Sequence, residues 1–432
     1  MPINESTRED GVARREIWAW AMYDFANSGY TTVVITAVFS AYFVNVVAGN
    51  ATWATLAWTL ALALSYALVL VTAPLIGAYA DLHGNKKRLL ALSTIGCVVC
   101  TALLANVGPG DLWLGVLILV ASNYFFGTGE DLIAAFLPEL GKRSGLGRIS
   151  AWGWSLGYLG GLLALGVSLA YVTAAQARGA GAADFVPVTM LITASIFAVA
   201  AIPTFVFLRE RATPNLNIGT QSGALARLLE TWRSAQRYQD LWRFLICLVF
   251  YQAGVQTVVA LAAVYAEQAM GFSTSQTITL ILLVNIAAAA GAFAFGHVQD
   301  RFGHRPTVAA TIVGWMITVV VSWLATSVNV FWIAATLAGI CLGSSQSAGR
   351  ALVGLLSPRE RVGEFFGLWG MAMKLAAILG PVTYGVVVWT AAGNHRTAML
   401  ATGAFFVVGF ALLFTVDVDR GRRAATECDD QG

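Results

Sequence analysis

Long apolar segments alternate with short polar ones along almost the whole chain. Each apolar segment has about 20 residues or more and few charges, which is the length at which an α-helix crosses the hydrocarbon core of a bilayer. The pattern predicts twelve membrane-spanning helices. They lie at residues 17–47, 54–80, 89–107, 112–137, 149–172, 186–208, 242–268, 275–298, 306–326, 329–352, 363–390 and 396–416.

One polar connection, at residues 209–241, is longer than the others and separates two groups of six helices. Within it, leucines and a tryptophan recur at helical spacing over residues 222–238, which predicts an amphipathic helix on the membrane surface. This helix either connects the two halves or serves as a regulatory docking site. The expected parts are a cytosolic N-terminal segment 1–16, an N-terminal six-helix bundle 17–208, a cytosolic linker 209–241, a C-terminal six-helix bundle 242–416 and a cytosolic tail 417–432.

Charged residues are few and unevenly placed. They make up 11% of the chain, against 58% for hydrophobic residues, whereas an ordinary soluble domain has about 25% charged residues. Of the 26 Lys and Arg residues, 23 fall on one side of the predicted helices, Arg178 and Arg396 fall on the other, and Lys374 lies inside a helix. Because cytosolic loops are enriched in Lys and Arg, we expect this side and both termini to be cytosolic.

A loop sequence occurs twice. Residues 77–88 read GAYADLHGNKKR and residues 296–305 read GHVQDRFGHR, with the two Asp residues 219 positions apart. Independently, LPE at 137–139 and SPR at 357–359 place their prolines 220 positions apart. Two matching offsets predict an internal repeat of the halves, which is typical of secondary transporters with a substrate site between the repeats.

The repeated loop has a physical use in each position. Its glycines permit tight packing or a turn at positive φ, its Asp can lie against the N-terminus of a helix, and its bases can pair with carboxylates. The alternative is an ordinary pair of positively charged cytosolic loops. The predicted gating-loop residues are Gly77, Asp81, Gly84, Arg88, Gly296, Asp300, Arg301, Gly303 and Arg305.

Several short stretches along the chain form a recognisable set. They are YDFANSGY at 23–30, LPE at 137–139, GRISAWGWSLGYLGG at 147–161, QT at 256–257, QSAGR at 346–350, FFGLWG at 365–370, Lys374 and LGP at 379–381. With these stretches the chain resembles the major facilitator superfamily over its whole length, and within it the bacterial relatives of the yeast vacuolar effluxer Atg22, the UMF1-type facilitators. The resemblance implies an all-α membrane protein with two six-helix bundles, working as a secondary active transporter by alternating access. It also implies an amino acid or similar zwitterion as substrate and a bacterial inner (plasma) membrane as location.

Asp24 needs an explanation because residues 17–47 hold no other formally charged residue. A carboxylate in hydrocarbon costs roughly 3 kcal/mol on insertion scales. Asp24, Asn27, Ser28 and Thr31 follow one another at i, i+3, i+4 and i+7 and so share one face of a helix. In facilitators helices 1, 4, 7 and 10 face the cavity, so we expect this face to meet water or substrate. The alternative is a structural Asp24 that is hydrogen-bonded to a neighbouring helix.

Further polar residues inside predicted helices are candidates for the substrate or ion cavity. Gln252 and Gln256 lie at i, i+4, where their amides either bind a polar solute or join helices by hydrogen bonds. Lys374 lies near the middle of its helix, where it binds a substrate carboxylate or neutralises a buried Asp. The complete candidate set is Asp24, Asn27, Thr31, Asn123, Gln252, Gln256, Gln346 and Lys374.

A cytosolic gate is predicted from the repeat, which places Glu130 of the fourth helix and Arg350 of the tenth at equivalent depths. We expect Glu130 or Asp131 to pair with Arg350 in one state of the transport cycle and to separate from it in another. The competing interpretation pairs Glu130 or Asp131 with Arg88 in the loop after the second helix.

The sequence lacks the motifs of an enzyme. It contains no G-x-x-x-x-G-K-[ST], so ATP hydrolysis is not expected, and its glycine runs at 157–161, with Gly166, and at 339–343 suit close helix packing. The four His residues fall in predicted loops or, for His297, at the end of a predicted helix, and Cys97 and Cys100 lie in an apolar helix, so neither a metal nor a cofactor is expected.

The function predicted from these patterns is transport. The expected partners are a small-molecule substrate, the lipid bilayer and protons or sodium as the coupling ion, with no nucleic acid, and the expected state is a monomer. An efflux pump for amphiphilic drugs or lipids is one alternative. A non-transporting receptor or scaffold is another, against which the duplicated loops argue.

The gate interpretation makes a testable prediction. Reversing either charge, by Glu130→Arg or by Arg350→Glu, should stop transport, and the double variant should restore it if the two side chains pair. Uptake into proteoliposomes measures the effect. A double variant as inactive as the single variants would instead favour pairing with Arg88.

Overall fold

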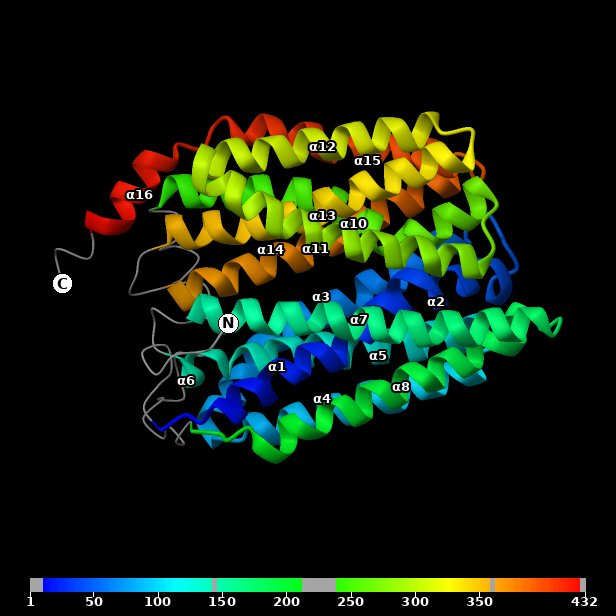
Figure 1. The fold of residues 1–432 in the computed structure, drawn as a ribbon, viewed down its shortest axis with the longest axis horizontal. Coiled ribbons are helices and arrows are strands. Elements are labelled where there is room, and N and C mark those ends of the chain that lie inside the picture. Colours follow the sequence, from blue (N-terminus) through cyan, green and yellow to red (C-terminus); the bar gives the residue numbers. More distant parts are fainter. Residues whose placement is uncertain (1–10, 142–145, 212–237, 358–361, 428–432) are drawn as a thin grey trace. The chain divides into compact units, whose positions relative to one another are not determined.

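The chain folds almost entirely into helices. The computed structural model describes residues 11–141, 146–211, 238–357 and 362–427 (Figure 1). The elements are α1 (Arg14–Gly29), the π-helix η2 (Tyr30–Ala37), α2 (Phe39–Tyr42), the π-helix η3 (Phe43–Val47), α3 (Ala54–His83), α4 (Lys86–Leu103), the 3-10 helix η4 (Leu104–Asn106), α5 (Leu112–Ala134), α6 (Leu137–Leu140), α7 (Leu146–Ala177), α8 (Ala182–Phe207), α10 (Gln239–Met270), α11 (Thr274–Phe302), α12 (His304–Leu324), α13 (Val328–Leu356), α14 (Val362–Thr390), α15 (His395–Leu413) and α16 (Val418–Glu427).

Within the described ranges, twelve spans are long and apolar enough to cross a membrane. This number and the all-α class confirm the prediction from the apolar pattern. The boundaries differ by a few residues; the span predicted at 89–107, for example, covers Lys86–Asn106. The amphipathic helix predicted at 222–238 lies outside the described residues, apart from its last residue.

The first span is not a uniform α-helix. After Gly29 it continues as η2, and the N–H of Val38 donates to the carbonyl of Val33, five residues back, at 2.9 Å. A second such bond joins Ala48 to Phe43 at the end of η3, also at 2.9 Å. Turns of this wider kind are rare and are often found at functional sites.

Glycines with positive φ end several helices. Gly84 follows α3 with φ 59° and Gly271 follows α10 with φ 70°, and this left-handed conformation costs glycine no clash with a side chain. Gly303, between α11 and α12, has φ 88°. Among the repeated loop glycines, Gly84 and Gly303 therefore serve the turns, whereas Gly77 lies within α3.

Contacts divide the described chain into two compact units. The first contains the described residues up to Ala54 and those from Leu64 to Arg211, and the second contains Thr55–Ala63 and the residues from Tyr238 onward. The boundary passes through α3, whose first turns group with the second unit.

In the first unit, α1 and α7 approach one another closely. A Cβ atom added to Gly160 of α7 would lie 2.7 Å from the carbonyl carbon of Phe25 in α1, and one added to Gly29 would lie 3.0 Å from Cβ of Ala164. Helices in hydrocarbon associate through close packing of small residues of this kind. Gly166, by contrast, has open space beside it, so its predicted packing role is wrong.

The second unit uses the same device. A Cβ atom added to Gly380 of α14 would lie 2.6 Å from the carbonyl carbon of Ala253 in α10, and one added to Gly343 of α13 would lie 2.6 Å from that of Ala288 in α11. These glycines therefore set the separation of the helices in both pairs, α10 with α14 and α11 with α13.

Matching positions make matching contacts in the two units. The hydroxyl of Tyr23 in α1 lies against Gly129 of α5, and the hydroxyl of Tyr251 in α10 lies against Gly349 of α13. Both tyrosines are buried, with exposed fractions of 1% and 0%. The tyrosines are 228 residues apart and the glycines 220, the same offset as between the contacting glycines of α7 and α14. The internal repeat thus extends from the loops into the helix packing.

The contact between α1 and α7 predicts a stability difference between two glycine positions of one helix. Gly160→Ala should lower the free energy of unfolding by about 1–3 kcal/mol, because backbone atoms, which cannot move aside, occupy the place of the new methyl group. Gly166→Ala should be neutral or stabilising by up to about 1 kcal/mol, because alanine favours the helix. Melting temperatures of the purified protein in detergent test this, and equal values for the two variants would contradict it.

Candidate functional site

The carboxylate of Asp24 lies over Gly153 of α7. A Cβ atom added to Gly153 would collide with Asp24 Oδ2 and would come within 2.9 Å of the Trp20 ring. Asp24 itself is half-buried. Helix α1 therefore accommodates the charged Asp24 because Gly153 of α7 has no side chain at this point. A larger residue in place of Gly153 would displace the carboxylate.

The other members of the predicted stripe lie around Asp24. Asn27 is buried, with 6% of its surface exposed, and Ser28 is half-buried and donates a hydrogen bond to the backbone carbonyl of Asp24 at 2.7 Å. Thr31 is half-buried and lies in the π-helix η2. Asp24 is therefore followed by three polar residues within two turns, and the last of them stands where the helix changes its geometry.

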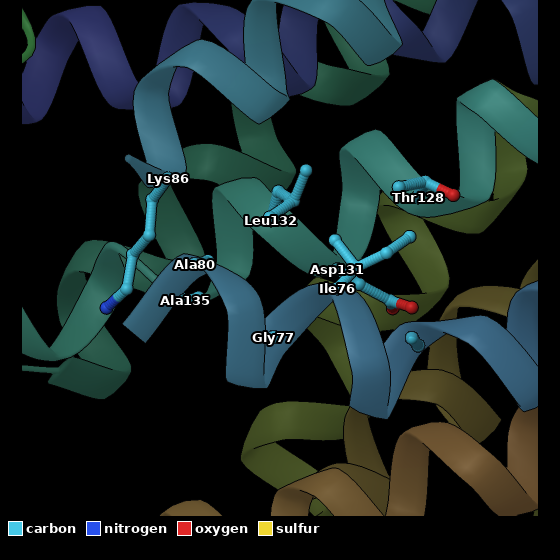
Figure 2. A pocket seen from close by; sticks show the side chains of 9 residues that line it. Ile76, Gly77, Ala80, Lys86, Thr128, Asp131, Leu132 and Ala135 are labelled. Atoms are coloured by element: carbon cyan, nitrogen blue, oxygen red, sulfur yellow. The ribbon is translucent and has the colours of Figure 1, made fainter. Parts of the chain in front are cut away.

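Helix α5 presents its polar residues in different ways. Asn123 is fully buried, and its Nδ2 donates to Ser65 Oγ of α3 at 2.6 Å, so it joins two helices of the first unit. Glu130 is exposed and Asp131 is half-buried. Asp131 lines a hollow of about 110 Å³ between α3 and α5 (Figure 2).

The candidate residues of the second unit lie on α10, α13 and α14. Gln252 is buried, with 1% exposed, whereas Gln256, Gln346 and Lys374 are half-buried. Arg350 is also half-buried, and the central carbon of its guanidinium lies 5.0 Å from the centre of the Trp369 ring. Of the two predicted glutamines on α10, Gln256 therefore has the more accessible side chain in this structure.

Part of the predicted gating loops can be placed. Arg305 at the start of α12 donates to the carbonyl of Phe414 beyond α15 at 3.2 Å, and Arg301 and Arg88 are exposed. Gly77 faces open space, since an added Cβ atom would meet nothing within 4 Å. The side chains of Asp81 and Asp300, like residue Gly296, lie outside the described set.

The repeat gives the polar residues of the two units different charges. At the offset of 228 that relates Tyr23 to Tyr251, Asp24 corresponds to Gln252. At the offset of 220, Glu130 corresponds to Arg350. The framework is therefore repeated while the charges are not, and the carboxylates of α1 and α5 belong to the first unit alone.

Comparison with known families decides the assignment. Residues 57–426 match the family described as "Vacuole effluxer Atg22 like". The chain belongs to this family. The match covers most of both units and confirms the resemblance found in the sequence stretches.

The relatives of this Atg22-like chain come from bacteria and fungi. It is 27% identical to the "Uncharacterized MFS-type transporter YxiO" of Bacillus subtilis (strain 168), over 95% of this chain and 97% of that protein. It is 23% identical to "Autophagy-related protein 22" of Yarrowia lipolytica, over 71% of this chain and 57% of that protein. The fungal proteins thus contain additional sequence beyond the matched part.

Solved structures of transporters share the fold. A bacterial homologue of the human lysosomal transporter Spinster, in an inward-facing and unoccupied conformation, superposes with a TM-score of 0.71 at 15% identity, over 96% of this chain and 99% of that chain. The nucleoside transporter NupG gives 0.67 at 14% identity over 94% and 98%. The human organic anion transporter MFSD10 gives 0.65 at 16% identity over 93% and 99%. The chain therefore has the fold of major facilitator superfamily transporters.

An ion-pair network lies at the end of the first unit where α4 begins, and, of its contacts, only the pairing of a loop base with a carboxylate was predicted from the sequence. Lys86 Nζ lies 3.1 Å from Glu139 Oε1, and the backbone N–H of Arg211 donates to Glu139 Oε2 at 3.0 Å. The guanidinium of Arg211 in turn donates to Glu16 Oε1 at 3.0 Å. Glu16 is buried, with 3% exposed. The network fastens the chain after α8 to α1, α4 and α6.

The N-terminus of α4 is capped by the same stretch of chain. Glu210 accepts hydrogen bonds from the backbone N–H groups of Lys86 and Lys87, the latter at 3.2 Å. Lys87 Nζ donates back to the carbonyl of Leu208 at 2.6 Å. A carboxylate at the first turn of a helix satisfies unpaired N–H groups and is favoured by the helix dipole.

The second unit has a comparable fastening. Asp240 at the start of α10 accepts two hydrogen bonds from the guanidinium of Arg420 in α16, both at 2.7 Å. These bonds raise the pKa of Arg420 above its usual range. Residues 417–432 were expected only as a tail, and the structure places a helix, α16, in their described part.

Sequence signals for these contacts existed only in part. The bases of the repeated loop were expected to pair with carboxylates, and Lys86 confirms this. Its partner Glu139 belongs to the LPE motif, 53 residues further on. For the contacts of Glu210 and Arg211, the one signal in the sequence was the alternation of charge at Arg209–Arg211, directly after the sixth apolar segment.

Glu139 carries two of the bonds in this network, so its loss should be measurable. Glu139→Gln should lower the free energy of unfolding by about 1–3 kcal/mol, because Lys86 is left partly buried without its counter-charge. The loss should shrink at high salt, since screening weakens the pair in the wild type. Asp111→Asn neutralises an exposed carboxylate of the same unit and serves as the control. Equal melting temperatures for both variants would show that the network adds no stability.

Proposed function

We propose that this protein is a secondary active transporter that moves a small zwitterion, such as an amino acid, by alternating access of its two units, driven by a gradient of protons or sodium. Family and fold support transport as the general activity. One observation supports the zwitterion: each unit holds an ionisable side chain of opposite sign, half-buried in a membrane-spanning helix, Asp24 in α1 and Lys374 in α14.

The charge pattern favours this substrate class on physical grounds. Ionisable residues inside the membrane are expensive and usually serve a substrate or ion path. A carboxylate attracts a substrate ammonium group, and an ammonium group attracts a substrate carboxylate. The solved structures of similar fold include carriers of nucleosides and of organic anions, so the fold accommodates polar solutes.

The remaining candidate residues have roles in the same proposal. Glu130 or Asp131 on one unit and Arg350 on the other form the cytosolic gate, and the repeated loops contribute to its closure. Asn27, Thr31, Asn123, Gln252, Gln256 and Gln346 supply neutral polar groups to the substrate path. The excess of Lys and Arg on one side supports both termini in the cytoplasm, and the similarity to a transporter of Bacillus subtilis supports a bacterial inner (plasma) membrane.

Uptake by proteoliposomes tests the proposal. Purified protein is reconstituted, and uptake of a mixture of labelled amino acids is measured with and without an imposed pH gradient or sodium gradient. Asp24→Asn should abolish saturable uptake, because the substitution removes the charge while it keeps the size of the side chain. Asp419→Asn, which neutralises an exposed carboxylate of α16, should transport like the wild type.

Two outcomes would contradict the proposal in different ways. Normal uptake by Asp24→Asn would remove the carboxylate from the mechanism. Absence of uptake by folded, inserted wild-type protein would remove amino acids as substrates. In that case, extrusion of a fluorescent amphiphile from the same liposomes would assign the protein to drug or lipid efflux.

A further inference from the structure

A hollow lies inside the first unit between α3 and α5, and its lining includes the larger apolar residues Ile76 and Leu132 besides several small ones. Its volume is about 110 Å³, which is room for an ion and several water molecules. Ala73, Gly77 and Ala80 of α3 line one side, and Thr128 and Asp131 of α5 line the other. Figure 2 shows Thr128 and Asp131 on the same side of α5.

Gly77 lines the hollow and helps to keep it open. It is the first glycine of the repeated loop sequence, and it was expected to serve close packing or a turn. It lies in the middle of a helical stretch, and a Cβ atom added to it would meet nothing within 4 Å. The absent side chain therefore leaves space, as Gly153 leaves space for Asp24.

Thr128 supplies the second observation. Its side chain is 95% buried, with 5% exposed, and its Oγ1 has no hydrogen-bond partner among the described residues. Buried threonines in these helices ordinarily donate to a carbonyl one turn back, as Thr94 does to Leu90 at 2.7 Å. A buried hydroxyl without a partner is destabilising, so a ligand that binds it would remove a cost that the protein otherwise bears.

We propose that Thr128 and Asp131 form a binding site for a monovalent cation, Na⁺, in this hollow. Hydroxyl and carboxylate oxygens are the ligands that hard cations prefer, and the hollow has room for water to complete the shell. Asp131 is the single carboxylate among the described residues that line the hollow, and one carboxylate ligand suits a monovalent better than a divalent ion. The site adds to the proposed function by naming the coupling ion. The role of Na⁺ in coupling rests on the proposed function, whereas the binding of Na⁺ does not, because binding requires no transport.

The charged neighbours of the site are consistent with this assignment. Lys86 also lines the hollow, but its amine lies 3.1 Å from Glu139, and Figure 2 shows it at the opposite end from Thr128. Its charge is therefore already balanced by Glu139. Glu130, next to Asp131 in the chain, is exposed and adds negative charge nearby.

Thermal stability in different salts tests the site on the full-length protein in detergent. Wild-type protein should show a saturable rise in melting temperature, of several degrees, when Na⁺ replaces choline at constant ionic strength, because a ligand that binds the folded state stabilises it. K⁺ should give a smaller rise. Equilibrium binding of radioactive sodium to the same samples should saturate at one ion per chain.

Three variants separate the site from general effects. Asp131→Asn should abolish the Na⁺-dependent rise, and Thr128→Val should raise the half-saturating Na⁺ concentration about tenfold, which corresponds to the loss of one ligand at 1.4 kcal/mol. In choline, Thr128→Val should be as stable as the wild type or more so, because it removes an unpaired buried hydroxyl. Thr173→Val, at an exposed threonine of α7 bonded to its own helix, should keep the full Na⁺ response.

Filling the hollow provides a test that leaves both ligands in place. Gly77→Val should fold, since its side chain enters open space, and should lose Na⁺ binding. Gly166→Val, also in open space, should bind Na⁺ like the wild type.

Several results would overturn the site. They are an equal stabilisation by Na⁺, K⁺ and choline, a Na⁺ response that persists in Asp131→Asn, or a response to pH alone, which would make Asp131 a proton site. Sodium binding without any solute uptake would instead contradict the transport proposal and leave the site standing. Uptake driven by a pH gradient, with no sodium binding, would contradict the sodium site and leave the transport proposal standing.

Discussion

The structure of each unit depends on how closely the helices within that unit approach one another. In hydrocarbon, apolar side chains gain little by leaving lipid, so helix association relies on contact between backbones at small residues. Gly160 against Phe25 in the first unit and Gly380 against Ala253 in the second provide this contact. Since these glycines are 220 residues apart, one solution to the packing problem has been used twice. The polar residues are then placed by helices whose separation is already fixed.

The same absence of side chains serves two purposes along these helices. At Gly160 it brings backbones together, at Gly153 it makes room that the Asp24 carboxylate itself occupies, and at Gly77 it leaves open the hollow that Asp131 also lines. A carboxylate inside a membrane needs such space, because water, an ion or a substrate group must reach it to offset its desolvation. At positions related by the repeat, the charges of the side chains differ between the two units, whereas the packing of the helices is similar. Each of the two carboxylates is therefore accommodated in a unit whose counterpart has no carboxylate at the same position.

The number and position of the helices were predictable because the thickness of hydrocarbon sets the length of each apolar segment. The rotation of each helix about its axis was not. Gln252 and Gln256 lie on the same predicted face, yet only Gln252 is almost fully buried, since a helix that is apolar all round gives no periodic signal for its orientation. The network of Glu16, Glu139 and Arg211 was also out of reach, because it joins residues far apart in the chain. Thr128 looks like any helical threonine until its hydrogen bonds are traced.

The π-helical turns of the first span accompany a difference in length between the two corresponding spans. That span runs 24 residues beyond Tyr23 to Val47, whereas α10 runs 19 residues beyond Tyr251 to Met270. A helix can take in extra residues without breaking its hydrogen-bonded ladder if some turns widen, and η2 and η3 are such turns. The two spans therefore match in length less well beyond the tyrosine than before it. The first span can therefore be five residues longer beyond its tyrosine than its counterpart and still keep every turn hydrogen-bonded.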